Sequence, residues 1–360
     1  MANKKVIILL PKIGNSGPSK GALALSKGIC DQYSVTVFSL EEKKLKEKNS
    51  YKNTQVIFLK SFFNIKILKY LSFFSKIKNL KKKYDKIVVI SFTLIPDIFV
   101  SLLPNDIKKI SSIRMNIFRD YKYLFGYLYF FIVKLHVYAL SRFNVVVTMH
   151  NKMKNQFPIN LKRKIVNISN FIDEESLSKY RKNKISSKEI IKIVYCGSLI
   201  KRKDPIALIY AIKKIKSMNR KVSLDLIGSG PLLRHLKFLV NKFDLNQEVF
   251  FHGHLKNPYK IMSNNDLFVL PSQTEGVSRA MLEALYLGLY CIVRNIDGNS
   301  DIIKDKKNGY LFENNTELFN KILKAENLKN SKITSKNELL PTHCKYDKNI
   351  QRYLDLINEI

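Results

Sequence analysis

Residues 266–288 read DLFVLPSQTEGVSRAMLEALYLG, and this stretch decides the fold class. An apolar strand over 266–270 ends in a Pro-Ser turn and a short loop. An apolar face that includes Met281 and Leu282 then predicts a helix starting near Ser278. Strand, loop and helix in this order are the repeating unit of parallel α/β domains. Such a helix begins at the carboxyl end of a parallel strand, where open sheets bind ligands and where helix amides attract phosphate.

The same alternation of short apolar strands and longer helical stretches runs through the 360 residues. Two sets of six strands are predicted: 5–10, 34–40, 55–59, 86–91, 109–114 and 144–149; then 190–196, 222–227, 248–252, 266–270, 290–293 and 309–312. We therefore expect an α/β protein with two doubly wound, Rossmann-like domains. The expected domains are 1–168 and 169–340, followed by a C-terminal helix at 341–360 that could return to the N-terminal domain.

The charge of the chain is strongly positive, because 63 Lys and Arg outnumber 29 Asp and Glu and leave +34. Residues 1–170 carry 31 basic and 8 acidic residues, or +23, and the rest of the chain carries +11. This balance indicates nucleic acid, an anionic membrane or phosphorylated substrates as partners. Compositional drift toward Lys, Asn and Ile, with no Trp in the chain, explains much of the charge but not its asymmetry.

Two segments of the first half contain no acidic residue. Residues 60–84 interleave eight lysines with Phe, Leu and Ile, and residues 121–143 are rich in aromatic side chains. Both are expected to be helical. Either they pack on the first sheet with lysines at their edges, or they form basic amphipathic surfaces on an anionic leaflet. Packing is favoured for 121–143, and the two alternatives are even for 60–84.

Several other classes of protein are excluded by pattern. The four cysteines are scattered, which argues against a disulfide scaffold or zinc module and predicts a reduced, cytosolic protein. The apolar run at 6–10 is short and fits a strand better than a signal peptide. The longest uncharged apolar stretch, 123–133, is too short to span a bilayer. The loop at 14–21 fails the spacing of both the P-loop and the dinucleotide-binding motif.

Glu275 and Glu283 form a spaced pair of carboxylates, one in the loop and one on the predicted helix. They project from different elements, and both could face one ligand. The alternative is a loop acid beside an ordinary helix-surface acid, and the spacing alone leaves both open.

The stretch PSQTEGVSRAMLEALYLGL at 271–289 resembles the signature of family 4 retaining glycosyltransferases. Further segments are similar to the family in the same order: 6–29, 143–153, 167–177, 193–205, 225–240, 249–257 and 308–313. The resemblance covers most of the chain and is loose over 40–140. It implies a GT-B-type fold, in which an N-terminal acceptor-binding domain and a C-terminal nucleotide-sugar-binding domain face each other across a cleft.

The resemblance also implies roles for individual residues. Glu283 would hydrogen-bond the ribose of the donor, Glu275 would contact the transferred sugar, and Lys203 would neutralise the diphosphate leaving group. The implied catalytic residues are Glu275 and Lys203. The implied donor-binding residues are Glu283, Ser198, Arg202, Gly276, Val277, Ser278 and Gly17. No cofactor and no obligatory metal are implied, because the nucleotide-sugar is a substrate and no Asp-x-Asp pair is present.

The chain departs from the family pattern at three positions. Ser198 stands where an arginine is common, and Arg202 is a candidate to compensate, although a hydroxyl cannot replace a guanidinium. Arg114 stands where a histidine is frequent, and Asp301 where a glutamate is usual. Arg114 is therefore predicted as a contact to acceptor or donor. His150, at the end of a predicted strand in the cleft region, is a second candidate for such a contact.

The resemblance predicts a metal-independent, retaining transfer of a hexosyl-type sugar. The donor would be a UDP-sugar, and the acceptor a bacterial surface polysaccharide or lipid-linked oligosaccharide. We expect an anionic membrane surface as a further partner, no nucleic acid, and a cytoplasmic location, peripheral on the inner face of the cell membrane. The alternatives are a catalytically impaired homologue acting as a membrane-associated assembly factor, or a nucleotide-sugar epimerase or hydrolase on the same scaffold. A nucleic-acid-binding protein is a rival on charge but lacks a recognisable reader motif.

Overall fold

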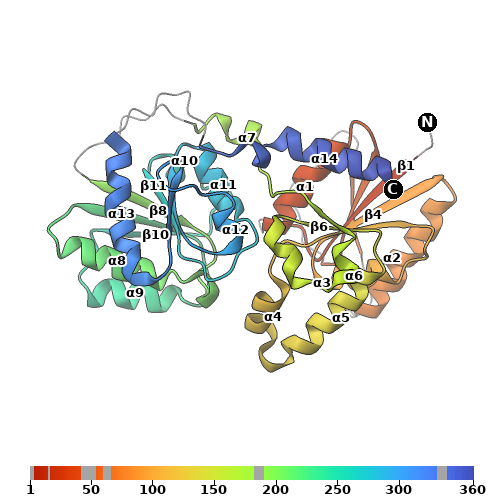
Figure 1. Ribbon diagram of the computed structural model, residues 1–360, viewed down its shortest axis with the longest axis horizontal. Helices are drawn as coiled ribbons and strands as arrows, with labels where there is room; N and C mark the ends of the chain where they lie inside the picture. The colour runs from red at the N-terminus through yellow and green to blue at the C-terminus, as the bar shows by residue number, and fades with distance from the viewer. Residues whose placement is uncertain (1–3, 15–16, 42–53, 60–65, 182–189, 331–338) are drawn as a thin grey trace. The chain divides into compact units, whose positions relative to one another are not determined.

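The computed structural model describes residues 4–14, 17–41, 54–59, 66–181, 190–330 and 339–360. The chain divides into two compact units, and each is built on a parallel sheet (Figure 1). The first unit comprises Met1–Asn170 with Tyr346–Ile360, and the second comprises Phe171–Lys345. The predicted fold class, α/β with two doubly wound units, is confirmed. The expected boundary after residue 168 lies two residues before the observed division.

The first unit holds a seven-stranded sheet in the order β3-β2-β1-β4-β5-β6-β7. Its strands are β1 (Lys4–Leu10), β2 (Ser34–Ser39), β3 (Thr54–Phe58), β4 (Lys86–Ser91), β5 (Lys108–Ser112), β6 (Val145–Thr148) and β7 (Ile165–Asn167). Residues 6–10 of β1 are completely buried, as expected for a central parallel strand covered on both faces. The strand order reverses between β1 and β4, which makes that point the topological switch of the first sheet.

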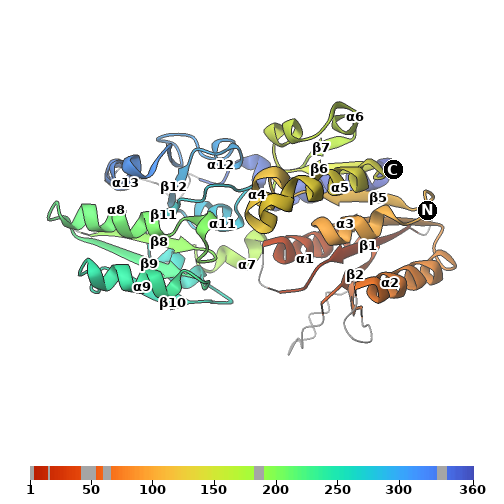
Figure 2. The same ribbon diagram turned by 90° about the horizontal axis from the view of Figure 1, so that it is seen from below.

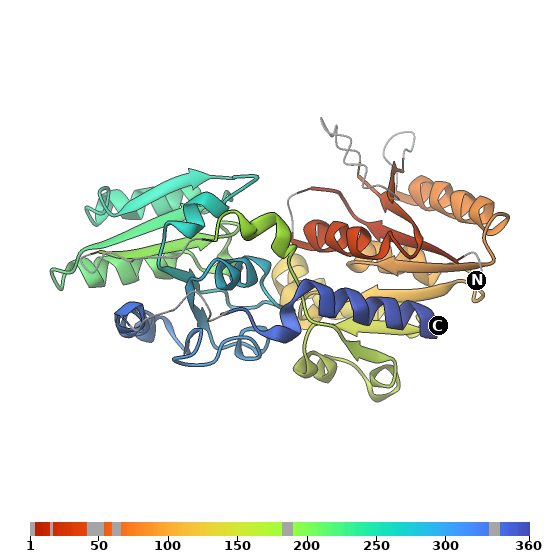
Figure 3. The same ribbon diagram turned by 90° about the horizontal axis from the view of Figure 1, so that it is seen from above.

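The helices of the first unit include one from the far end of the chain. They are α1 (Gly17–Ile29), α2 (Lys66–Lys81), α3 (Leu94–Ser101), α4 (Ile117–Phe125), α5 (Tyr129–Ser141), α6 (Ile159–Lys162) and α14 (Tyr346–Glu359), with the 3₁₀ turns η2 (Gly126–Leu128) and η3 (Asn151–Gln156). Helix α14 lies beside α1 (Figure 3). Ile350 of α14 fits over Gly28, where a Cβ would come within 2.5 Å of the Ile350 side chain. The Tyr346 hydroxyl donates to the Ala24 carbonyl at 3.0 Å.

The second unit holds a six-stranded sheet in the order β10-β9-β8-β11-β12-β13 (Figure 2). Its strands are β8 (Ile191–Cys196), β9 (Val222–Ile227), β10 (Val249–Gly253), β11 (Leu267–Leu270), β12 (Tyr290–Arg294) and β13 (Gly309–Phe312). Its helices are α7 (Glu174–Ser178), α8 (Ile206–Lys216), α9 (Leu233–Lys242), α10 (Tyr259–Ser263), α11 (Arg279–Tyr286), α12 (Asp297–Ser300) and α13 (Asn315–Asn330), with η4 (Lys201–Lys203) and η5 (Thr342–Cys344). The strand order reverses between β8 and β11, so the loops that follow these two strands meet at the switch point.

All twelve predicted strands are confirmed, and the differences concern short or polar segments. Strand β7 was not predicted, because it has three residues in a sequence rich in Asn, Ser and Lys. The mostly polar composition of 324–337 predicts a connector, which is wrong for its first part, because α13 continues to Asn330; residues 331–337 lie outside the described residues. Helix α2 confirms the helical expectation for 66–81 of segment 60–84, whose residues 60–65 also lie outside.

Candidate functional site

The loops after β8 and β11 build the candidate site of the second unit. Strand β11 ends at Leu270, and α11 begins at Arg279 with Ser278 in the N-cap position, as the sequence predicts. The Ser278 side chain makes no capping hydrogen bond. Gly276, Val277 and Ser278 all lie in the loop that enters this helix and are buried.

The two loops are joined by main-chain and side-chain hydrogen bonds. The Gln273 amide donates to the Arg202 carbonyl at 2.9 Å, and the Arg202 guanidinium donates back to the Thr274 carbonyl at 2.9 Å. Next to this junction, Lys203 Nζ and Glu275 Oε1 form a hydrogen-bonded ion pair. Their side chains are 15% and 10% exposed. The structure therefore brings the predicted residues Arg202, Lys203 and Glu275 together at the switch point.

Glu283 lies inside the second unit and not on a helix surface. The residue is 4% exposed, and its carboxylate accepts a hydrogen bond from the Tyr259 hydroxyl at 3.3 Å. Burial, and then the neighbouring Glu283 carboxylate, raises the pKa of Tyr259, so this hydroxyl keeps its proton and acts as a donor. Burial lowers the pKa of the Arg279 guanidinium, and the charge of Glu283 opposes that shift. A buried carboxylate held by such partners is costly to desolvate, which argues against the alternative of an ordinary helix-surface acid.

Two glycines allow backbones to approach this site closely. A Cβ at Gly298, in α12, would lie 1.3 Å from the Gly276 carbonyl oxygen. A Cβ at Gly228 would lie 1.8 Å from the Gly197 carbonyl oxygen, and the φ of 152° at Gly228 also favours glycine. The loops after β8 and β11 are therefore held by direct backbone contacts from the loops after β9 and β12.

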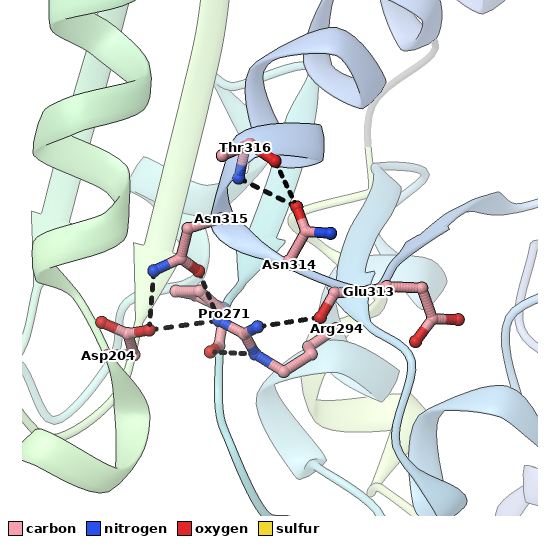
Figure 4. A network of polar contacts seen from close by, with 7 residues as sticks. All are labelled: Asp204, Pro271, Arg294, Glu313, Asn314, Asn315 and Thr316. Carbon is pink, nitrogen blue, oxygen red and sulfur yellow. Dashed lines mark hydrogen bonds and ion pairs between the residues drawn. The ribbon is translucent and has the colours of Figure 1, made fainter.

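Arg294, at the end of β12, ties three segments of the site together (Figure 4). Its Nε donates to the Pro271 carbonyl at 3.2 Å and its Nη1 to the Glu313 carbonyl at 3.1 Å. Its Nη2 pairs with Asp204 Oδ2 at 3.1 Å. Asp204 directly follows Lys203 and has a left-handed φ of 49°. A guanidinium fork can serve these separate acceptors at once, which an ammonium cannot do in the same geometry.

Residues 178–338, nearly all of the second unit, match the family model described as glycosyl transferases group 1. This match identifies the second unit as a group 1 glycosyl transferase domain. One curated relative is the UDP-Gal:alpha-D-GlcNAc-diphosphoundecaprenol alpha-1,3-galactosyltransferase of Escherichia coli. It is 33% identical over 146 residues, which are 39% of this chain and 38% of the relative.

A further curated relative and a solved structure are similar to this chain. The poly(ribitol-phosphate) alpha-N-acetylglucosaminyltransferase of Staphylococcus aureus is 28% identical over 48% of this chain and 34% of its own length. The chain thus spans little more than a third of the length of these two curated relatives. The crystal structure of Anabaena HepE in complex with UDP and glucose has a TM-score of 0.80 at 16% identity, with 99% of this chain and 100% of HepE covered. That likeness shows the GT-B fold.

The predicted residues of the first unit lie after the carboxyl ends of its strands. Gly17 opens α1 after β1, Arg114 follows β5, and His150 follows β6 and is buried. The Arg114 guanidinium donates to Asn170 Oδ1 at 2.7 Å and lies over the Phe92 ring, 4.9 Å from its centroid. In a parallel sheet these carboxyl ends share one edge, so the three residues belong to the same edge of the first sheet. Contacts of Gly17, Arg114 and His150 to a substrate stay predictions.

The other residues of the site, both predicted and unpredicted, lie in the second unit. Ser198 is exposed in the loop after β8, and its carbonyl accepts from the Tyr195 hydroxyl at 2.8 Å. Tyr259, Arg279 and Arg294 were not predicted from the sequence. Of these, only Arg279 stands inside the 266–288 stretch, and its place between Glu275 and Glu283 was a signal that could have identified it as a site residue. Among the described residues, no group of three or more His, Cys, Asp or Glu side chains could hold a metal ion. The predicted lack of a metal requirement stays a prediction.

Proposed function

We propose that this protein transfers a sugar from a UDP-sugar to a bacterial surface polysaccharide or a lipid-linked oligosaccharide. The observation that carries the proposal is the Lys203–Glu275 ion pair at the switch point of the second sheet, with the buried Glu283 carboxylate on the helix that follows. The pair holds a cation and a carboxylate close together, and a donor has groups for both: a diphosphate for Lys203 and sugar hydroxyls for Glu275.

The proposed chemistry follows from where charge develops. When the bond from the sugar to the diphosphate breaks, the departing diphosphate gains negative charge. The Lys203 ammonium and the Arg202 guanidinium stabilise that charge because they are already positioned, and partial burial strengthens the interaction. A bound diphosphate competes with Glu275 for Lys203, which releases the Glu275 carboxylate toward the sugar. The Glu283 carboxylate accepts hydrogen bonds from the ribose hydroxyls.

The relatives support the choice of donor and acceptor. The Escherichia coli relative is named for UDP-Gal and a diphosphoundecaprenol-linked acceptor, and the Staphylococcus aureus relative for a poly(ribitol-phosphate) acceptor. HepE has been crystallised with UDP and glucose. We extend the proposal to retention of the anomeric configuration, to metal independence, and to a peripheral location on the cytoplasmic face of the cell membrane.

Calorimetry with UDP, and turnover measured as UDP released from UDP-glucose, UDP-galactose and UDP-N-acetylglucosamine, test this function. The Lys203→Ala variant should bind UDP about ten- to a hundredfold more weakly, since one hydrogen bond to a charged group is lost. The Glu275→Gln variant should keep UDP binding and lose about a hundredfold or more in turnover. Lys201→Ala is the matched control, because Lys201 is exposed in the same short turn.

Two results would overturn the proposal. One is a wild-type protein that binds no nucleoside diphosphate. The other is a Glu275→Gln variant with full turnover on a donor that the wild type uses. Binding of UDP without turnover on any donor or acceptor would favour the impaired homologue. The anomeric configuration of the product, read by NMR, tests retention, and turnover in the presence of a chelator tests metal independence.

A further inference from the structure

The segment from Ile117 to Ser141, here called the aromatic hairpin, exposes an unusual amount of apolar surface. The described residues include 19 exposed large apolar side chains, and ten of them lie in this segment. They are Phe118, Tyr123, Leu124, Phe125, Tyr127, Leu128, Phe130, Phe131, Leu135 and Tyr138. Soluble proteins rarely expose contiguous apolar patches of this kind unless the patch meets a partner or a membrane.

Packing on the sheet accounts for only one face of the aromatic hairpin. Tyr121, Val133 and Leu140 are buried, whereas Tyr127 at the turn is completely exposed. The sequence favoured packing for 121–143, and the structure restricts that expectation to this inner face. The outer face and the turn remain largely exposed in the described part of the chain.

The hairpin geometry decides between crossing a membrane and entering its surface. As one continuous segment, 117–141 has 25 residues and contains an 18-residue window with a mean hydropathy of 1.4, enough in length and composition for a membrane span. The structure breaks it at Gly126, whose φ of 54° and ψ of −128° end α4. Its two limbs, α4 and α5, have 9 and 13 residues and pack against each other. A limb of 13 residues is about 20 Å long, shorter than the bilayer's hydrocarbon core of about 30 Å.

The charges around the hairpin select an anionic partner. Arg119, Lys122 and Lys134 are its cations, Arg142 follows it directly, and its one acidic residue, Asp120, is buried. Lys134 lies over the Phe130 ring at 4.6 Å, and Arg142 over the Tyr138 ring at 5.4 Å. Aromatic rings beside cations are typical of groups at a membrane interface. A second copy of the chain is a poor partner, because each copy carries +34.

We propose that the aromatic hairpin inserts its turn into the interface of an anionic lipid bilayer. This deepens the proposed membrane location and does not depend on which sugar is transferred. The apolar side chains at and near Tyr127 enter the headgroup and acyl boundary, and the surrounding cations meet lipid phosphates.

A series of buried hydrogen bonds connects the aromatic hairpin to the first sheet. The Ser91 hydroxyl, at the carboxyl end of β4, donates to Asp97 Oδ1 at 2.5 Å. Asp97 Oδ2 lies 2.8 Å from His136 Nε2, and His136 Nδ1 lies 2.7 Å from the Tyr121 hydroxyl. Burial, and then the charge of Asp97, raises the pKa of Tyr121, so its hydroxyl stays protonated. Insertion of the hairpin therefore holds the carboxyl edge of the first sheet, with Arg114 and His150, at a fixed position relative to the bilayer.

The absence of tryptophan from the chain allows a direct test. A Tyr127→Trp variant carries a single tryptophan at the turn, and a Phe238→Trp variant carries one at an exposed site of the second unit. With vesicles containing phosphatidylglycerol, the emission of the Tyr127→Trp variant should shift to shorter wavelength. Its indole should also become protected from acrylamide and be quenched by brominated acyl chains. The emission of the Phe238→Trp variant should not change, and vesicles of phosphatidylcholine alone should produce a weaker effect.

A second experiment replaces exposed apolar side chains by glutamate and measures binding to vesicles. A Leu128→Glu/Phe131→Glu variant should bind anionic vesicles at least about a hundredfold more weakly, on the order of tenfold for each exposed side chain. The matched Phe238→Glu/Phe250→Glu variant adds the same charge at exposed sites of the second unit and should bind like wild type. UDP binding should be unchanged in both, which separates this proposal from the donor site. The proposal would be overturned if the emission of the Tyr127→Trp variant did not shift, or if the Leu128→Glu/Phe131→Glu variant bound vesicles like wild type. It would also be overturned if the wild type were a dimer and this double variant a monomer.

Discussion

At the scale of single residues, Gly298 sets the position of the loop that carries Glu275. A Cβ at position 298 would lie 1.3 Å from the Gly276 carbonyl oxygen and 3.2 Å from that of Glu275. Because both contacts are backbone atoms, no side chain can rotate away, and the loop itself must move. Glu275 and its partner Lys203 would move with it.

We therefore predict that Gly298→Ala weakens UDP binding about tenfold and lowers the free energy of unfolding by about 1–3 kcal/mol, the usual cost of overpacking. Calorimetry and urea denaturation measure the two effects. Gly14→Ala is the control, since a Cβ there meets no atom within 4 Å, and it should change neither quantity. Wild-type UDP affinity in Gly298→Ala would show that the loop tolerates displacement.

The residues of the site differ in how far the sequence could predict them. Lys203, Glu275 and Glu283 could be predicted because each stands inside a local motif, and the sheet order then brings the two loops together. Tyr259 and Arg294 stand outside any motif and come close only because α10 and the end of β12 lie beside β11 and α11 in three dimensions. Single-sequence spacing carries no information on such contacts.

At the scale of elements, the docking of α14 on α1 depends on the pair Gly28 and Ile350. A Cβ at Gly28 would meet Ile350 Cδ1 at 2.5 Å and Cγ2 at 2.9 Å. Ile350→Ala should lower the free energy of unfolding of the first unit by about 2–4 kcal/mol, because it removes buried side-chain volume. In Gly28→Ala, the clash with Ile350 opposes the gain in helix propensity.

A double-mutant cycle tests this contact. In Gly28→Ala/Ile350→Ala the new methyl group occupies part of the space that Ile350 leaves, so the double variant should be about 1 kcal/mol more stable than the sum of the single effects predicts. Urea denaturation, with hydrogen exchange of the α1 and α14 amides to assign the first unit, measures the cycle. Strict additivity would mean that the two helices do not depend on this contact.

Elements whose apolar residues recur at one regular spacing could be predicted from the sequence, and elements without such a spacing could not. The strands and the terminal helix were predicted because apolar residues recur at a spacing that matches their geometry. Segment 121–143 is apolar on all sides, so its pattern does not tell which side chains face solvent. Its break at Gly126 places Tyr127 and Leu128 at the turn, which only the structure shows.

At the scale of the whole molecule, the positive charge is distributed unequally between the two units. The first unit, with its returning helix, carries 33 basic and 11 acidic residues, or +22, and the second carries 30 and 18, or +12. The smaller excess includes the lysine and arginine proposed to hold a diphosphate. The larger excess belongs to the unit with the aromatic hairpin and α2, where we propose that it meets anionic lipid.

The lysines at the end of α2 and just after it provide the last prediction. Lys78, Lys82 and Lys83 are exposed, whereas the neighbouring Lys81 pairs with Asp106 and is left unchanged. Each exposed lysine near an anionic leaflet contributes about 1 kcal/mol, so the triple change to glutamine should weaken binding to phosphatidylglycerol vesicles about a hundredfold at low salt. The same change should reduce the dependence of binding on salt, because fewer counterions are exchanged.

Vesicle sedimentation at several salt concentrations measures both the affinity for vesicles and its dependence on salt. In the control variant, three exposed lysines of the second unit are changed to glutamine: Lys242, Lys256 and Lys260. The outcome separates two origins of the charge. If the α2 variant loses binding and the control does not, the lysines at 78–83 act together with the hairpin, which supplies the apolar part of the attraction while they supply the electrostatic part. If both triple variants bind like wild type at every salt concentration, the charge arises from compositional drift, and the apolar turn alone must account for docking.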